Sequence, residues 1–440
     1  MKRRSLLFIG LVAMTVDGCT RTSLDIESLN AAPGGSSSTD TTGGLASTGG
    51  AVDVLGGTLS ASGGSRSGGS TGTATVSTDA GTLLKAVSVS SGVGFSCAVV
   101  TDGSVRCWGA NDYGQLGDGS GIFSDVPVTV SNANGLTAVA AGDSHACART
   151  ASGTVLCWGA NDHGQLGNGS TTNSTIPVAV EGLTGAIAIT AGSAFSCALF
   201  ADGTVQCWGS NLYGELGIGG TNSVDKSTFA VLVKGITNAT QISAGGSHSC
   251  AVLSDGSIQC WGFNVDGEIG NISPGWVAAA LEPITVVNLT DALLVAAGGW
   301  HTCAIVAGHY VKCWGAGGYG QLGNHTQSSG YQPVDVTEIH GTAVAISAGD
   351  SHTCATNADG TVYCWGSNST GQLGNGTTTN WSSPILVTNL YGVQSVAAGY
   401  GHNCALLNDG SVHCWGDNYN GDLGNSSQLQ SLIPVRVVGF

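Results

Sequence analysis

From residue 83 onward, the chain consists of short apolar runs that alternate with glycine-rich turns. One such unit contains four runs, at 127–130, 136–141, 145–149 and 154–158. The runs are rich in β-branched and small apolar residues, and each is too short for a stable helix. Glycine follows the second run, and Ser152-Gly153 forms a tight turn between the third and the fourth. The pattern predicts four short antiparallel strands per unit.

The tripeptide Cys-Trp-Gly marks the repetition of this unit. It occurs seven times, starting at Cys107, Cys157, Cys207, Cys260, Cys313, Cys364 and Cys414. Spacings of 50–53 residues, with four strands per unit, are typical of the blades of a β-propeller. The sequence therefore predicts an all-β, seven-bladed propeller of four-stranded antiparallel blades at residues 83–440.

The order of the strands within the repeats indicates where the ring closes. The first unit opens near Val87 with the second strand of the later units, and the chain ends with an additional first strand at 434–438. We expect this C-terminal strand to complete the first blade and so to join the two ends of the ring without a covalent bond.

The repeats resemble those of the regulator of chromosome condensation family. The resemblance rests on an Ala-Gly-x-x-His block at 141–145, an Asp-Gly turn as at 102–103, a Trp-Gly-x-Asn run at 158–161 and Gly-Gln-Leu-Gly at 164–167. It covers all seven units and implies a seven-bladed propeller that presents one face of loops to a partner. The departures from the pattern are Phe95 and Phe195 at the histidine position, Glu268-Ile269 in the fourth unit, and Phe229 near an expected proline.

Fourteen of the fifteen cysteines form one C-x9-C pair in each repeat. Zinc sites made of cysteine usually combine two closely spaced pairs, whereas these pairs stand alone in separate repeats. A hairpin whose three-residue loop ends at Gly103 places Cys97 opposite Cys107, at a position that suits a disulfide. We therefore expect no metal and seven disulfides: Cys97–Cys107, Cys147–Cys157, Cys197–Cys207, Cys250–Cys260, Cys303–Cys313, Cys354–Cys364 and Cys404–Cys414.

Five histidines recur two residues before a cysteine: His145, His248, His301, His352 and His402. A catalytic group is needed once in a protein, whereas a group that packs blades together is needed in every blade. Phenylalanine replaces the histidine twice, so the position requires a ring and not a base. We assign these histidines and the seven Cys-Trp-Gly tryptophans to packing between blades. No nucleophile elbow, zinc-protease or phosphate-loop motif occurs, so the sequence predicts neither an enzyme nor a cofactor.

The N-terminus resembles a bacterial lipoprotein signal peptide. Basic residues at 2–4 precede an apolar stretch at 6–16 that is too short to span a bilayer. The sequence Val-Asp-Gly-Cys at 16–19 is similar to a lipobox, from which Asp17 departs, and in that family Cys19 would carry the lipid. The alternative is an ordinary secretory signal with a chance cysteine.

These features divide the chain into a signal peptide at 1–19, a flexible tether at 20–82 rich in Gly, Ser and Thr, and the propeller at 83–440. We expect an exported lipoprotein on the outer membrane or surface of a Gram-negative bacterium, monomeric and held to the membrane only by its lipid. The net charge of −16 argues against a nucleic acid partner, because phosphate contacts need clustered Lys and Arg.

We expect the protein to be a binding module that recognises a protein or a glycan. The loop between the second and third strands of a unit, and the loop that follows the fourth, open on the same face of an antiparallel propeller. These loops hold aromatic residues that do not follow the repeat, and exposed aromatic side chains dominate binding hot spots. The candidate ligand contacts are Phe123, Trp276, Trp300, Tyr331 and Trp381.

Two alternatives stay open. One is an enzyme, a lyase or a hydrolase, with a site in the central channel, although no acidic or histidine residues that break the repeat stand out there. The other is a structural component of a surface layer. Loop aromatics that matter for binding would favour the binding module over the structural component.

The lipobox generates a direct prediction. Cys19→Ser should release the protein from the membrane fraction and abolish its labelling by a radioactive fatty acid, because the thiol that carries the lipid is gone. A Thr20→Ser variant, which keeps the thiol, should stay membrane-bound. A Cys19→Ser protein that remains in the membrane fraction would contradict the lipobox interpretation.

Overall fold

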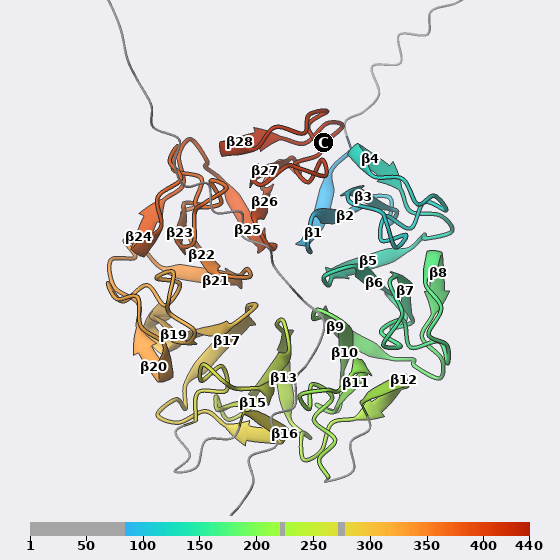
Figure 1. Ribbon diagram of the computed structural model, residues 1–440, viewed down its shortest axis with the longest axis horizontal. Coiled ribbons are helices and arrows are strands. Elements are labelled where there is room, and N and C mark those ends of the chain that lie inside the picture. The colour runs from blue at the N-terminus through green and yellow to red at the C-terminus, as the bar shows by residue number, and fades with distance from the viewer. Residues whose placement is uncertain (1–83, 221–224, 272–277) are drawn as a thin grey trace, which may run out of the picture. The chain divides into compact units, whose positions relative to one another are not determined.

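The computed structural model describes residues 84–220, 225–271 and 278–440, and these residues form seven separate four-stranded sheets. The sheets stand around a central axis like the blades of a propeller (Figure 1). Every pairing between neighbouring strands of a sheet is antiparallel and connects strands that are consecutive in the chain, as in β1–β2 and β2–β3. The prediction of an all-β, seven-bladed propeller is confirmed. Cys19, and with it the predicted signal peptide and tether, lies outside the described residues.

Each blade has an innermost, a second, a third and an outer strand, and the strands in the four positions are as follows. The innermost strands are β1 (Ala86–Ser91), β5 (Leu136–Ala141), β9 (Ala186–Ala191), β13 (Ala239–Ala244), β17 (Ala292–Ala297), β21 (Ala343–Ala348) and β25 (Val393–Ala398). The second strands are β2 (Phe95–Val100), β6 (His145–Thr150), β10 (Phe195–Phe200), β14 (His248–Leu253), β18 (His301–Val306), β22 (His352–Asn357) and β26 (His402–Leu407). The third strands are β3 (Val105–Gly109), β7 (Val155–Gly159), β11 (Val205–Ser210), β15 (Ile258–Phe263), β19 (Val311–Gly315), β23 (Val362–Gly366) and β27 (Val412–Gly416). The outer strands are β4 (Ser124–Thr129), β8 (Ser174–Ala179), β12 (Lys226–Leu232), β16 (Ala279–Thr285), β20 (Gly330–Asp335), β24 (Trp381–Leu386) and β28 (Ser431–Arg436), and a single-turn 3-10 helix, η1 (Ala307–His309), joins β18 to β19.

The hairpin between the second and third strands sets the position of the cysteines. In the first blade, the Val100 and Gly103 backbone nitrogens donate to the Ser104 and Val100 oxygens, and Gly103 has a φ of +77°. This turn places Cys97 opposite Cys107 in the register, with the Cα atoms 4.1 Å apart. The structure contains all seven disulfides that the spacing predicts, and each lies within one hairpin in the buried middle of its blade.

The predicted role of the C-terminal strand is wrong. The last strand, β28, pairs with β27 of its own blade, and the first blade has all four of its own strands in β1–β4. The segment after each third strand folds back and pairs with that same strand, so the boundary between blades falls after the outer strand and not before it. The outer strand is an edge strand, which is why it tolerates proline, as at Pro127 in β4.

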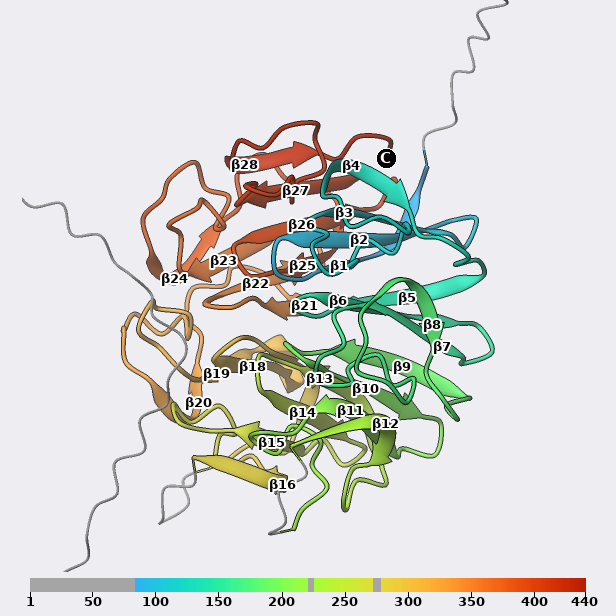
Figure 2. The same ribbon diagram turned by 45° about the vertical axis from the view of Figure 1, so that its right-hand side comes forward.

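Packing and hydrogen bonds close the ring instead. The last blade lies beside the first in both views (Figures 1 and 2). The Trp108 and Phe440 rings are in contact, with centroids 5.9 Å apart, and the Leu84 nitrogen donates to the Gly439 oxygen at 3.1 Å. This junction therefore buries a core like that between any two consecutive blades.

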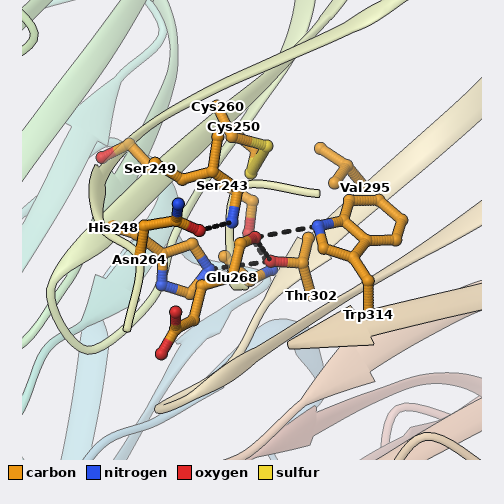
Figure 3. The surroundings of a disulfide bond; sticks show 12 residues. Ser243, His248, Ser249, Cys250, Cys260, Asn264, Glu268, Val295, Thr302 and Trp314 are labelled. Carbon is orange, nitrogen blue, oxygen red and sulfur yellow. Dashed lines mark hydrogen bonds between the residues drawn. A yellow bond between two sulfur atoms is a disulfide. The ribbon is translucent and has the colours of Figure 1, made fainter. Parts of the chain in front are cut away.

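A hydrogen-bonded junction joins each blade to the next (Figure 3). Between the fourth and fifth blades, the Trp314 indole nitrogen and the Thr302 hydroxyl both donate to the backbone oxygen of Glu268, at 2.8 Å each. The Thr302 oxygen is also 2.8 Å from Nε2 of His248. Since the Thr302 hydrogen goes to Glu268, Nε2 of His248 must be the protonated nitrogen and must donate to Thr302.

The junction recurs around the ring. The indoles of Trp108, Trp158, Trp208, Trp261, Trp314, Trp365 and Trp415 donate to the backbone oxygens of Asp422, Gln115, Gln165, Glu215, Glu268, Gln321 and Gln372 at 2.8–2.9 Å. The histidine Nε2 atoms lie 2.7–2.9 Å from Ser196, Thr302, Thr353, Asn403 and Ser96 of the next blade. Where Phe95 replaces the histidine, the next blade has Ala146 in place of the hydroxyl residue, and the two share a core cluster. Histidine and tryptophan therefore hold blades together, as the repetition predicts.

The buried histidines make stability depend on acid. Burial lowers the pKa of His145 from its ordinary value of 6.5 to about 4. Between pH 6.5 and 4, this histidine therefore binds a proton in the unfolded chain but not in the folded chain. Stability therefore falls as the pH falls through this window, by roughly 2 kcal/mol for one such histidine at pH 5.

His145→Phe should remove one histidine's share of this acid sensitivity, and it recreates the Phe195 junction already present in the third blade. Urea unfolding at pH 7 and pH 5 should show a loss of stability between the two that is smaller by about 1–2 kcal/mol than in the wild type. His163→Phe, outside the junctions, serves as the control. Equal pH dependence in wild type and His145→Phe would show that the histidine does not stay neutral.

The Gln position of Gly-Gln-Leu-Gly contains a second buried titratable group. In the first blade the Gln115 side-chain oxygen accepts a hydrogen bond from the Tyr113 nitrogen. In the fourth blade Glu268 takes this position, is fully buried, and accepts from the Asp266 nitrogen through Oε2. Its Oε1 has no hydrogen-bond partner among the described residues. Burial raises the pKa of Glu268 to about 7.

Glu268→Gln should stabilise the protein at alkaline pH. The wild-type carboxyl keeps its proton in the folded state up to about pH 7, so stability is lost as the pH rises from 4.5 through 7. Gln, the residue of four other blades, removes this cost, and we expect a gain of about 1–3 kcal/mol at pH 8 and a much smaller gain at pH 5. Glu181→Gln, on the surface, is the control. A gain that does not change between pH 5 and pH 8 would show that ionisation is not its cause.

Candidate binding face

The loops of the propeller open on two different faces. The first–second strand loops and the third–outer strand loops share one face, where the Ala110 nitrogen donates to the Gly94 oxygen at 2.7 Å. We call this the upper face. The second–third strand turns and the connections between blades share the lower face, where the Leu136 nitrogen donates to the Gly103 oxygen at 2.9 Å.

A ring of glycines surrounds the channel at the upper face. A Cβ atom on Gly92 would lie 2.1 Å from the oxygen of Gly142, and one on Gly399 would lie 2.6 Å from the oxygen of Gly92. The same close approach occurs at Gly142, Gly192, Gly245, Gly298 and Gly349. The Tyr400 nitrogen donates to the Gly92 oxygen at 3.2 Å, so the ring continues from the last blade to the first. Only glycine lets seven backbones meet this closely around the axis.

A cavity of about 330 Å³ lies on the axis at this ring. Its walls are the glycines, the alanines and serine at the ends of the innermost strands, and the residues that follow the glycines. A second cavity of about 250 Å³ lies farther along the channel and shares the alanine ring, with Thr190, Gln241 and Ser347 in its walls. We call the first one the axial cavity.

The residue after each glycine makes the wall of the axial cavity different in each blade. These residues are Val93, Asp143, Ser193, Gly246, Gly299, Asp350 and Tyr400, and all of them line the cavity. Asp143 belongs to the second blade and Asp350 to the sixth, so the two carboxylates face the axis from nearly opposite sides of a ring of seven. The repeat thus builds the cavity, and the departures from the repeat give it its chemistry.

The two carboxylates are positioned by their neighbours. Burial and the Asp350 charge raise the pKa of Asp143, against a hydrogen bond from Ser193 that lowers it. Oδ2 of Asp350 accepts a hydrogen bond from the Ser351 hydroxyl at 2.8 Å. A Cβ atom on Gly299 would be 2.5 Å from Oδ1 of Asp350, so the carboxylate rests directly on the glycine of the preceding blade.

Three aromatic rings lie in a row on the upper face beside the axial cavity. The Trp300 and Phe263 centroids are 5.6 Å apart and those of Phe263 and Tyr213 are 5.0 Å apart, both in edge-to-face contact. Trp300 also lines the axial cavity. Trp300 and Tyr213 keep 44% and 43% of their surface exposed, which is far more than a ring that only fills the core would keep. We call these three residues the aromatic row.

The predicted ligand contacts are spread over the molecule. Trp300 lies at the axial cavity, and Phe123 is exposed at the end of the upper-face loop before β4. Tyr331 and Trp381 lie in the outer strands β20 and β24 and not in the loops where the sequence placed them. Their loops are shorter than predicted because the outer strands begin earlier. Trp276 lies outside the described residues.

Sequence reasoning missed Phe263, Asp143 and Asp350. Phe263 directly follows Cys-Trp-Gly, where five other units have Ala or Ser, so a break in the repeat could have revealed it. The two aspartates stand in the variable position of the Gly-x-x-His block. Their significance depends on the fact that this position faces the axis, which the sequence pattern alone does not show.

The described residues contain neither a cluster of three or more His, Cys, Asp and Glu side chains that could hold a metal nor a helix long and apolar enough to cross a membrane.

The upper face combines a small cavity that contains polar groups with exposed aromatic rings. This arrangement suits the recognition of another molecule.

Comparison with known proteins identifies the repeat. The family described as "Regulator of chromosome condensation (RCC1) repeat" matches residues 102–149, 152–199, 202–252, 311–356, 359–406 and 409–440. A second description of the same repeat matches seven segments between residues 86 and 422, one in each blade. Together the matches cover more than half of the chain.

Curated relatives match part of the chain. The human E3 ubiquitin-protein ligase HERC2 is 31% identical over 39% of this chain and 4% of its own length, and the ultraviolet-B receptor UVR8 of Arabidopsis thaliana is 35% identical over 35% of each. This chain thus spans about a third or less of the length of these relatives.

Solved structures show the same fold. Human WBSCR16 has a TM-score of 0.68 at 22% identity, covering 75% of this chain and 92% of its own. Prp20p of Saccharomyces cerevisiae has a TM-score of 0.67 at 21% identity, covering 81% of this chain and 87% of its own. At these identities the likeness concerns the fold.

Proposed function

Since the chain belongs to the regulator of chromosome condensation repeat family, we propose that it is a binding module that recognises a partner protein through the upper face of its propeller. The observation that carries the proposal is the aromatic row beside the axial cavity. Exposed Trp and Tyr side chains, here supported from below by the half-buried Phe263, are frequent at the centre of a protein-binding hot spot.

The distribution of differences among the repeats supports the upper face. Five of the seven lower-face turns share one design, since Asp102, Asp202, Asp255, Asp359 and Asp409 each accept a hydrogen bond from the backbone two residues later. The upper face holds the residues that break the repeat, among them Phe263 and Trp300. A face that recognises one partner needs such individual positions, whereas a face that only caps the blades does not.

The relatives are consistent with protein recognition. Yeast Prp20p has binding properties to Gsp1p and histones, and its structure is known with Kap60 bound. These partners are known for Prp20p and are not assigned to this chain. From residue 83 on, this chain has 7 basic and 22 acidic residues, a net charge of −15, which disfavours nucleic acid as its partner.

We propose that recognition takes place outside the cell. The lipobox-like sequence at Cys19 supports an exported, lipid-anchored protein, and the seven disulfides fit an oxidising compartment. The Gly-, Ser- and Thr-rich stretch at 20–82 would then serve as the tether between the lipid and the propeller.

The axial carboxylates favour a second candidate, an enzyme that acts in the channel. A carboxyl group with a raised pKa, opposite a second carboxylate, is the pair that glycoside hydrolysis uses. We rank it second because the exposed rings of Trp300 and Tyr213 lie on an open face that a folded partner can reach. Release of a chromogenic group from aryl glycosides, lost in both Asp143→Asn and Asp350→Asn, would favour it over binding.

Two substitutions test the proposed face, and each introduces a residue that other repeats have at the same position. Phe263→Ala installs the alanine of Ala110 and Ala160, and Trp300→Ser installs the serine of Ser144 and Ser351. We expect each to weaken binding by about 1–3 kcal/mol with little change in the melting curve, because the lost contact area lies in the interface. The measurement is affinity for a partner isolated by crosslinking and pull-down with the full chain.

The matched control lies on the lower face. Tyr310 is 70% exposed in the β18–β19 turn, and Tyr310→Thr installs the residue of Thr154 and Thr361. This variant should bind normally. Loss of binding in Tyr310→Thr, with normal binding in Phe263→Ala and Trp300→Ser, would place the interface on the lower face. Normal binding in all three would favour a structural role for the propeller.

A further inference from the structure

We propose that the axial cavity receives a single cationic side chain, an arginine or a lysine, from the partner that rests on the aromatic row. The inference deepens the proposed function and rests on it. It concerns the chemistry of one pocket in the middle of the upper face and commits the partner to a basic residue at the centre of its interface.

The size and place of the cavity fit one side chain. About 330 Å³ is at the lower end of the range for cavities that hold small ligands, which begins near 300 Å³. Seven glycines, one from each blade, surround the cavity, so its size is that of one long side chain and not of a folded segment. A partner loop would therefore stay on the upper face and send one side chain inward.

The walls of the cavity select the sign of the charge. Among the described residues, the side chains that line it include Asp143 and Asp350 and no Lys, Arg or His. The two carboxylates repel one another across the axis, and burial in a narrow cavity strengthens this repulsion because water screens it less. A cation between them would relieve the repulsion and gain charge-assisted hydrogen bonds from both sides.

The aromatic residues favour an organic cation. Trp300 and Tyr400 line the same cavity, and Trp300 directly follows Gly299, on which the Asp350 carboxylate rests. An indole beside a carboxylate suits a guanidinium or ammonium group, which is attracted both to the ring face and to the carboxylate. A calcium ion would need six or more oxygen ligands, whereas the cavity offers two carboxylates, from nearly opposite sides, among serine hydroxyls and small or apolar side chains.

The test compares a charged probe with a neutral one of the same shape. N-acetyl-arginine amide and N-acetyl-citrulline amide are titrated into the full chain by calorimetry and by ligand-observed NMR. We expect the arginine probe to bind at least tenfold more tightly than the citrulline probe. Equal binding of the two probes, or no binding of either, would overturn the proposal without the need for any variant.

Two double variants locate the binding. Asp143→Asn with Asp350→Asn should reduce the affinity for the arginine probe at least tenfold. Asp112→Asn with Asp162→Asn removes the same charge from exposed loops of the upper face away from the axis, and should leave the affinity unchanged. An equal loss in both double variants would mean general attraction to an acidic surface and would overturn the proposal.

The remaining outcomes separate this inference from the proposed function. If an isolated partner binds through the aromatic row but is indifferent to the Asp143→Asn and Asp350→Asn pair, the cationic pocket is wrong and the binding face stands. Calcium or a neutral oligosaccharide could instead bind and lose affinity in the Asp143→Asn and Asp350→Asn pair, while the arginine probe does not bind. The cavity would then hold a different kind of ligand, and the proposal of a cationic side chain would be wrong. If the arginine probe binds as expected and the partner's affinity does not change in Phe263→Ala and Trp300→Ser, the pocket stands and the proposed contact with the aromatic row is wrong.

Discussion

The whole propeller depends on one junction, in which the tryptophan of each blade donates to a backbone carbonyl of the blade before it. In four of the seven junctions a serine or threonine hydroxyl donates to the same carbonyl, and in one the Asn403 amide does. A four-stranded sheet cannot bury both of its faces alone, so each blade needs a neighbour on each side. The junction supplies both the apolar area, through the indole, and the directional bond that fixes the angle between blades. In five junctions a histidine adds a hydrogen bond to the next blade, and burial lowers the pKa of His248 to about 4, which keeps this histidine neutral. Seven junctions built on the tryptophan bond close the ring.

The sequence predicts the strands of each blade well, because seven copies of the repeat show the same pattern of apolar runs and glycine turns. The hairpin turn that ends at Gly103 sets the register of β2 against β3. This register predicts the disulfide between Cys97 and Cys107. The blade boundary was wrong, because a strand such as β4 could pair with the strand before it or with the blade after it, and both fit the same periodicity. Trp300 was found because it breaks the repeat, whereas Asp143 and Asp350 gain their meaning only from facing each other across an axis that closure creates.

Aspartate has two unrelated roles in this fold, and its position in the blade decides which one it takes. On the lower face, the side-chain and backbone hydrogen bonds of Ser104 hold the pKa of Asp102 below its usual value, so the charge stabilises the turn. At the axis, burial raises the pKa of Asp143, so its charge is costly until something compensates for it. The first kind of aspartate recurs from blade to blade, and the second kind does not. The scaffold thus separates the charges that maintain it from those that are available to a ligand.

The local pairing of the cysteines has a consequence for how the chain acquires its covalent structure. Fourteen cysteines can combine in about 135,000 ways, yet every native partner is the next cysteine in the chain, ten residues away. Each bond can form as soon as its own hairpin is available in an oxidising environment, without waiting for any later blade. Oxidation can thus proceed in the order of synthesis, with little need for an isomerase to rearrange wrong pairs. Because no disulfide links two blades, a lineage could gain or lose a whole blade and leave the pairing of all the others intact.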